Sequence, residues 1–160
     1  MPPPCYTLPM TVQRIRSGSP YEPAIGFSRA VRVGDRVLVS GTGPVWPDGS
    51  CPNDPGEQAR RCIKIIADAL AGAGATLADV VRTRMYLTDV GAAQAVGLVH
   101  GELFGAVGPA ATMVVVAGLL DPRWVVEIEA EAWLRPDRTA PDEQGPDQDA
   151  AAGRTTAAVP

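Results

Sequence analysis

The segment Val126-Glu127-Ile128-Glu129-Ala130-Glu131-Ala132-Trp133 decides how the rest of the chain is arranged. Apolar and acidic residues alternate along it, which is the period of a β-strand with one buried face. The four aliphatic residues are therefore expected to point toward a core, and the three glutamates and Trp133 toward the other side. We expect the strand to extend from Arg123 to Leu134. A sheet built around it has one apolar face and one face that carries carboxylates.

Further strands are expected upstream of this segment. Two short β-type runs, at 30–33 and 37–40, are joined by Gly34-Asp35-Arg36, a combination typical of a hairpin. Residues 80–87 and 112–117 are expected to form two more strands. Alternation within 80–87 predicts one face made of Val81, Thr83, Met85 and Leu87 and another made of Arg82, Arg84 and Tyr86.

Two helices separate these strands. Apolar residues recur at helical spacing between Ala59 and Leu70, after a possible cap at Asn53 or Asp54 and a proline at position 55. Gly72 and Gly74 are expected to end this helix. A second helix is expected from about Asp89 to Phe104. The order of elements is strands, helix, strand, helix and two strands, which predicts an α+β domain.

One face of the predicted sheet has no helix left to cover it. Its charged residues are the glutamates of the last strand and Arg82 and Arg84, and we expect Met113, Val115 and Trp133 among them. A sheet face that mixes apolar side chains with charges of both signs is typical of a subunit interface. The sequence therefore predicts that the protein works as an oligomer.

The length of 160 residues fits one domain, which we place at 11–135. Residues 1–10 contain four prolines and are expected to form a flexible arm. Residues 136–160 lack aromatic residues, leucine and isoleucine. Such a composition buries too little apolar surface to offset the entropy of ordering, so a disordered tail is expected there.

The composition argues against several classes of function. The net charge of −4 disfavours a nucleic-acid-binding surface. Three irregularly spaced cysteines and a single histidine favour neither disulfides nor a metal site. Lys64 is the only lysine, so Schiff-base chemistry is disfavoured. No targeting signal or apolar run of membrane-spanning length occurs, and we expect a cytoplasmic protein that does not enter a membrane.

Several motifs, in order, resemble the reactive-intermediate deaminase family (Rid, also called YjgF or L-PSP). They lie between about Ser17 and Leu134, and each is weak alone, whereas their order and spacing are specific. The matching segments are Gly26-Phe27-Ser28-Arg29-Ala30-Val31, Val37-Leu38-Val39-Ser40-Gly41, residues 73–83 (AGATLADVVRT), Tyr86-Leu87-Thr88-Asp89, Pro109-Ala110-Ala111-Thr112-Met113-Val114 and Val126-Glu127-Ile128-Glu129-Ala130.

The resemblance implies a chorismate-mutase-like α+β fold with a mixed six-stranded sheet and two helices on one face. It also implies a homotrimer whose sheets form a central barrel, with a small-molecule site in each cleft between subunits. Members with the complete site hydrolyse enamines and imines to a keto acid and ammonia without cofactor or metal. In them an arginine holds the substrate carboxylate and a glutamate of the last strand positions water.

The substrate-binding arginine of the family is missing from this sequence. It follows Pro-Ala on the penultimate strand, where this chain has Ala111, and a family cysteine two residues later is Met113. A charge-assisted hydrogen bond contributes roughly 1.5–3 kcal/mol, and a bidentate pair makes two. The sequence therefore resembles an arginine-less branch of the family, for which 2-aminoacrylate is not the expected substrate.

Other positions of the family site are also changed. The tyrosine of the first loop is Phe27, and an asparagine of the second helix is Gly97. Glu127 stands at the position of the family's glutamate, and the backbone of Ser40 and Gly41 is retained. The expected cleft is less polar than in the complete family site, and it suits a larger or less charged ligand.

Glu127 and His100 are the two candidate catalytic residues. His100 lies three residues after Gly97, on the same face of the predicted helix, and is placed to act as acid or base if that face borders the cleft. The alternatives are that His100 is an exposed surface residue and that Glu127 neutralises Arg82 or Arg84 in a subunit interface. Trp124 is expected either to wall the cleft or to pack in its loop.

Two functions follow from these residues and stay open at the level of sequence. The first is a RidA-like trimeric hydrolase, or deaminase, that acts on an imine, an enamine or a related reactive intermediate. The alternative is a non-catalytic protein of the same fold that binds a small apolar metabolite or a partner protein. Ribonuclease activity, which has also been attached to the family, is disfavoured by the acidic composition.

Overall fold

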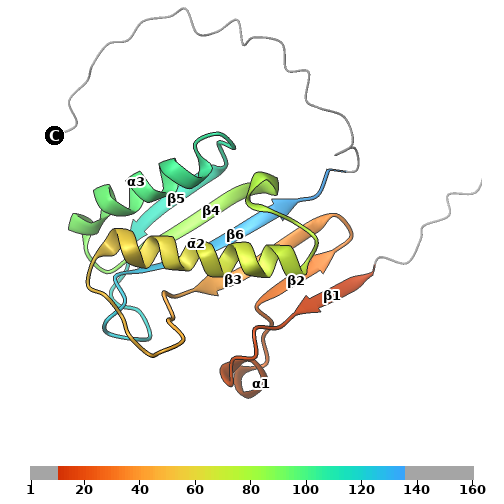
Figure 1. The fold of residues 1–160 in the computed structure, drawn as a ribbon, viewed down its shortest axis with the longest axis horizontal. Coiled ribbons are helices and arrows are strands. Elements are labelled where there is room, and N and C mark those ends of the chain that lie inside the picture. The colour runs from red at the N-terminus through yellow and green to blue at the C-terminus, as the bar shows by residue number, and fades with distance from the viewer. Residues whose placement is uncertain (1–10, 136–160) are drawn as a thin grey trace, which may run out of the picture.

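The computed structural model describes residues 11–135 (Figure 1). Its elements are β1 (Val12–Ile15), α1 (Tyr21–Ile25), β2 (Ala30–Val33), β3 (Arg36–Thr42), α2 (Pro55–Gly72), the 3-10 turn η1 (Leu77–Asp79), β4 (Val80–Leu87), the 3-10 turn η2 (Val90–Ala92), α3 (Ala93–Phe104), β5 (Ala110–Val115) and β6 (Val126–Trp133). The arm expected at 1–10 and the tail expected at 136–160 lie outside the described residues.

A single mixed sheet is built from six strands in the order β1-β2-β3-β6-β4-β5. Only the pair of β4 and β5 is parallel, and every other neighbouring pair is antiparallel. Both long helices, α2 and α3, lie on the same face of this sheet (Figure 1). The expected α+β fold, with a mixed six-stranded sheet and two helices on one face, is confirmed.

The alternation along β6 is confirmed and organises the core. Val126, Ile128, Ala130 and Ala132 are at most 2% exposed and lie on the helix-covered face. Because side chains alternate along a strand, the three glutamates and Trp133 point to the opposite face, which we call the open face. Helix α2 starts where predicted, since the Asp54 side chain accepts a hydrogen bond from the backbone N–H of Glu57 at 2.8 Å.

Three residues, Val81, Met113 and Val115, were assigned to the wrong face of the sheet from the sequence. Val80, at 2% exposed, is the buried residue at the start of β4, and Val81 is 47% exposed. The pairing of β4 with β6 shifts between Val80 and Arg82, so one extra residue inverts the alternation there. On β5, register with β4 puts Met113 beside the buried Met85 and Val115 beside the buried Leu87, so both lie on the helix-covered side instead of the open face, and Met113 packs against the core.

The sequence also missed two elements and misplaced a third. Strand β1 pairs with β2 at the sheet edge, and its residues, VQRI, show no alternation of apolar and polar side chains. Helix α1 spans only five residues. Strand β5 begins at Ala110, two residues earlier than expected, because parallel pairing with β4 starts there. Within 11–135, no helix combines the length and the apolarity needed to cross a bilayer.

Candidate functional site

Glu127 is a half-buried carboxylate on the open face of β6. Its neighbour across the strand pairing is Tyr86 of β4. On the β3 side it lies against Gly41, where an added Cβ atom would be 2.3 Å from Glu127 Oε1. Glycine at position 41 is therefore what allows the carboxylate to rest on the backbone of β3. Among residues 11–135, no hydrogen bond or ion pair to the Glu127 side chain is formed.

The other two glutamates of β6 are paired. Arg84 lies 3.3 Å from Glu129 and 3.2 Å from Glu131. Arg36 adds a contact of 2.6 Å to Glu131. The charge network on the open face thus excludes Glu127, and the idea that Glu127 neutralises Arg84 does not match the geometry of the single chain.

Burial is the main cause that raises the pKa of Glu127. The positive charge of Arg29 opposes this shift, and the negative charge of Glu129 adds to it. A carboxyl group with a raised pKa holds and releases its proton closer to neutral pH, which is what a general acid or base requires. Of the three open-face glutamates on β6, Glu127 is the one suited to proton transfer.

Arg29 belongs to this site although the sequence analysis did not single it out. Its Nη2 donates a hydrogen bond to the carbonyl oxygen of Gly41, and its guanidinium carbon lies 5.8 Å from the centre of the Phe27 ring. The nearby Ala30 faces the core, so alternation would have placed Arg29 on the open face. The signal was therefore present in the sequence, inside the quoted motif.

Ser40 and Trp124, two further residues predicted for the site, make packing and hydrogen-bond contacts to the backbone near Phe27 and β3. Ser40 Oγ donates a hydrogen bond to the carbonyl oxygen of Ser28 at 2.8 Å, so the hydroxyl fixes the loop before β2. Trp124 packs on Gly43, where a Cβ atom would be 2.4 Å from the indole ring. This contact with Gly43 supports a packing role for Trp124. We refer to Phe27, Arg29, Ser40, Gly41 and Glu127 as the Glu127 cluster.

His100 lies on the other side of the sheet. Its Nε2 is 2.9 Å from Thr83 Oγ1, and its ring centre is 4.8 Å from that of Phe104. Thr83 is fully buried on the helix-covered face of β4. Burial lowers the pKa of His100, which favours the neutral imidazole. His100 is neither an exposed surface residue nor, within one chain, a neighbour of Glu127.

Ala111 and Met113 lie on the same side as His100. Parallel register pairs Ala111 with Thr83, the residue that His100 contacts. Gly97 lies one turn before His100 on α3, and a Cβ atom added there would meet nothing within 4 Å. We refer to Gly97, His100, Ala111 and Met113 as the β5 cluster. The residues predicted as one site therefore form two groups on opposite faces of the sheet.

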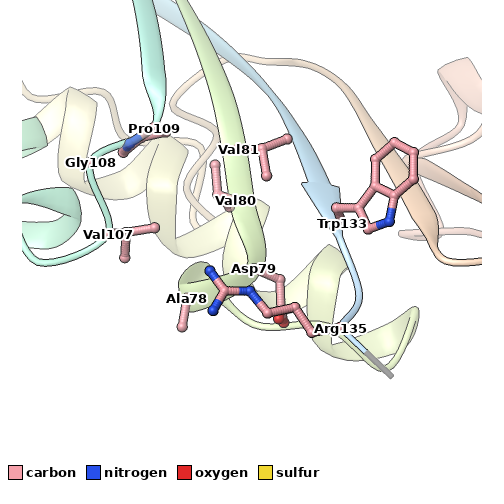
Figure 2. A pocket seen from close by; sticks show the side chains of 9 residues that line it. All are labelled: Ala78, Asp79, Val80, Val81, Val107, Gly108, Pro109, Trp133 and Arg135. Carbon is pink, nitrogen blue, oxygen red and sulfur yellow. The ribbon is translucent and has the colours of Figure 1, made fainter. Parts of the chain in front are cut away.

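A cavity of about 370 Å³ lies elsewhere, beside the start of β4 (Figure 2). Figure 2 shows the side chains that line it, namely Ala78, Asp79, Val80, Val81, Val107, Pro109, Trp133 and Arg135, with Gly108. Val80 pairs with Ala132, whereas Tyr86 pairs with Glu127, so the cavity and Glu127 are at opposite ends of these strands. Within 11–135, no three His, Cys, Asp or Glu side chains are grouped to hold a metal ion.

Comparison with known proteins gives one consistent family. A family model described as Endoribonuclease L-PSP matches residues 18–134. SCO2049, an uncharacterized protein of Streptomyces coelicolor, is 42% identical over 123 residues, which cover 76% of this chain and 92% of that protein. A RutC family protein of Pyrococcus abyssi is 36% identical over 110 residues, which cover 67% of this chain and 85% of that protein.

Solved structures agree with the sequence matches. Rv2704 of Mycobacterium tuberculosis, described as a member of the YjgF family, is 44% identical with a TM-score of 0.72, covering 78% of this chain and 100% of that chain. E. coli TdcF with bound serine is 25% identical with a TM-score of 0.65, covering 76% of this chain and 94% of that chain. The match over 18–134 and the shared fold lead to one conclusion: this chain belongs to the Rid/YjgF/L-PSP family.

Proposed function

We propose that this protein is a RidA-like trimeric hydrolase that deaminates an imine, an enamine or a related reactive intermediate. The observation that carries the proposal is Glu127, a half-buried and unpaired carboxylate with a raised pKa on the open face. Its environment suits proton transfer to and from water and a bound ligand.

The chemistry needs one group that both accepts and returns a proton. As the oxygen of water adds to the carbon of the protonated C=N group, the Glu127 carboxylate takes a proton from that water, and a neutral carbinolamine forms. The carbinolamine nitrogen then receives that proton from Glu127, and the carboxylate takes the proton of the hydroxyl as the C–N bond breaks. The carbonyl compound leaves, and ammonia leaves as ammonium with the proton that Glu127 returns. An enamine enters the same sequence after protonation at carbon. Each step balances with water as the only co-reactant.

A trimer explains why the predicted site residues lie on two faces. A cleft between subunits would be completed if the Glu127 cluster of one copy met the β5 cluster of the next. Strand β5 is an edge strand, and Val114 and Val115 on it are 43% and 54% exposed. Exposed aliphatic residues on a sheet edge favour coverage by another chain. The mixed open face supports the same assembly.

The substrate is expected to differ from 2-aminoacrylate. Ala111 offers no charge to a carboxylate on the β5 side, and Phe27 and Met113 add apolar surface. TdcF was solved with serine bound, which supports an amino-acid-sized ligand in this fold. The alternative function, non-catalytic binding of a small metabolite or partner, is favoured by the same loss of polar groups and is decided by turnover.

The test is hydrolysis of imines generated in solution from a series of amino acids, followed as release of ammonia and keto acid. Glu127→Gln should abolish turnover of the best substrate while the assembly mass stays unchanged. Glu57→Gln, which makes the same change on the exposed side of α2, serves as the matched control and should be fully active. Equal activity of the two variants, or no turnover across the series, would favour the binding function.

A further inference from the structure

Arg29 places a positive charge in the Glu127 cluster. The residue precedes β2 and reaches across to β3, where its Nη2 donates to the Gly41 carbonyl oxygen. Glu127 Oε1 approaches the same residue, Gly41, from the β6 side. The guanidinium and the carboxylate are thus brought to two sides of one glycine, and no ion pair joins them.

The guanidinium of Arg29 has unused hydrogen-bonding capacity. An arginine carries five N–H donors. In the described part of the chain, Nη2 bonds to Gly41, and Nε is buried without any partner. A buried unpaired N–H is costly and rare in folded proteins, so each one calls for an explanation. Nη1 also makes no hydrogen bond within residues 11–135, but it is not among the buried atoms, so it can donate to an acceptor that arrives with a ligand.

The surroundings hold the guanidinium in place. The Phe27 ring lies beneath it at 5.8 Å, within the range of a cation–π contact. The buried Glu22 carboxylate contributes a favourable charge from the interior side, where Ser17 N and Ser17 Oγ hold it at 2.9 and 2.7 Å. Arg29 as a whole is only partly buried.

We propose that Arg29 is the anion-binding residue of this site, and that the ligand carries a carboxylate which Arg29 holds beside Glu127. The inference rests on the proposed function, because it assumes that the Glu127 cluster lines the ligand site. It deepens that function by naming the substrate class as carboxylate-bearing, although Ala111 has removed the charge from the β5 side. The anchoring charge has moved from β5 to the residue before β2.

This relocation has a consequence for orientation. A carboxylate held by Arg29 lies on the same wall of the cleft as Glu127, whereas one held at position 111 would lie on the β5 side. The ligand is therefore bound in a different direction from that of the complete family site. A small substrate such as 2-aminoacrylate, which position 111 orients in the complete family site, is therefore not expected to be oriented in the same way here.

Binding of a carboxylate probe tests the inference independently of turnover. The probe is 2-oxobutanoate, a keto acid of the product class, compared with its uncharged methyl ester by calorimetric titration of the full-length protein. We expect Arg29→Gln to lower the affinity for 2-oxobutanoate by a factor of at least about ten. This factor corresponds to the lower end of the free energy contributed by one charge-assisted hydrogen bond. Arg29→Lys should recover part of the affinity, and binding of the ester should not respond to either change.

Arg82→Gln is the matched control, because it removes the same charge from an exposed arginine of the open face. It should bind 2-oxobutanoate like the unmodified protein. The proposal is overturned if 2-oxobutanoate does not bind, if Arg29→Gln binds it normally, or if Arg82→Gln weakens it as much. It also falls if Arg29→Gln changes the sedimentation mass while Arg29→Lys keeps full affinity, since Arg29 would then be structural.

The two proposals fail separately. Carboxylate binding that depends on Arg29 without any turnover would leave this inference standing and remove the hydrolase. Turnover that is lost in Glu127→Gln but unaffected by Arg29→Gln would keep the hydrolase and remove the role of Arg29.

Discussion

The Glu127 carboxylate rests on the backbone of Gly41, so close that a Cβ atom at position 41 would lie 2.3 Å from Oε1. The contact joins β6 to β3 on the open face and fixes where the carboxylate sits. Gly41 and Gly43 differ in what an added Cβ atom would meet. At Gly41 the clash would fall on the flexible end of the Glu127 side chain. At Gly43 the clash would fall on the rigid indole of Trp124.

Gly41→Ala is therefore expected to move Glu127 without unfolding the protein. The free energy of unfolding should fall by about 1 kcal/mol or less, because the carboxylate can rotate away. Activity that depends on Glu127 should be lost. Gly43→Ala is the matched comparison, and overpacking against the Trp124 ring should cost about 1–3 kcal/mol. Urea denaturation of both variants measures this, and equal losses would contradict the assigned contacts.

Glu127→Gln should change how stability depends on pH. The folded-state pKa of Glu127 is raised above 4.5 by burial. The contribution of this group to stability is thus fully present below its unfolded pKa and is lost as pH rises through the folded pKa. Glutamine does not ionise, so the Glu127→Gln variant does not lose stability in this way. Its free energy of unfolding should therefore rise relative to that of the unmodified protein between about pH 4.5 and neutrality. Denaturation at several pH values tests this, and a parallel pH dependence would refute it.

His100→Phe is expected to act on stability through Thr83. The substitution leaves the buried Thr83 hydroxyl without its imidazole partner, which should cost about 1–3 kcal/mol. Adding Thr83→Val removes both partners and should recover part of that loss. A double-mutant cycle measured by thermal or urea unfolding gives the coupling. Additive effects of the two substitutions would show that the contact contributes nothing.

The burial of His100 also predicts that the folded protein loses stability in acid. Burial depresses the folded-state pKa of His100 below 6.5. Its contribution to stability is present above the unfolded pKa and is lost as pH falls through the folded value. The unmodified protein should therefore lose stability below about pH 6.5 relative to His100→Phe. An unchanged difference from pH 7 down to pH 5 would disagree with a buried neutral imidazole.

The assembly is expected to be a trimer that depends on the exposed edge of the sheet. Sedimentation equilibrium should give about three times the chain mass of 16.7 kDa. Val114→Glu puts a charge on the open face of β5 and should dissociate the assembly. Val90→Glu, at a residue that is 72% exposed in η2, is the control and should not. A monomeric unmodified protein at micromolar concentration would exclude the intersubunit site.

Local pattern was sufficient for most of the fold. The alternation in β6 identified its buried and open faces, and Asp54 with Pro55 identified the start of α2, because these signals depend on neighbours in the chain. Strand β5 carried no such signal, since its aliphatic run is compatible with either face. The faces of Met113, Val115 and Val81 were misassigned because strand register and a bulge are decided by pairing with other strands.

The sequence by itself determined that Glu127 stands in a strand motif that resembles the family's, that Ala111 brings no charge, and that one sheet face is left without a helix. Only the tertiary structure decided that His100 contacts Thr83 behind the sheet, and that Arg29 and Glu127 meet at Gly41. Those contacts join residues 12 to 86 positions apart, from Arg29 with Gly41 to Gly41 with Glu127, and their geometry depends on strand order and register. Chemistry carried by one residue can be predicted from sequence, whereas chemistry shared between strands is set by how the strands pack.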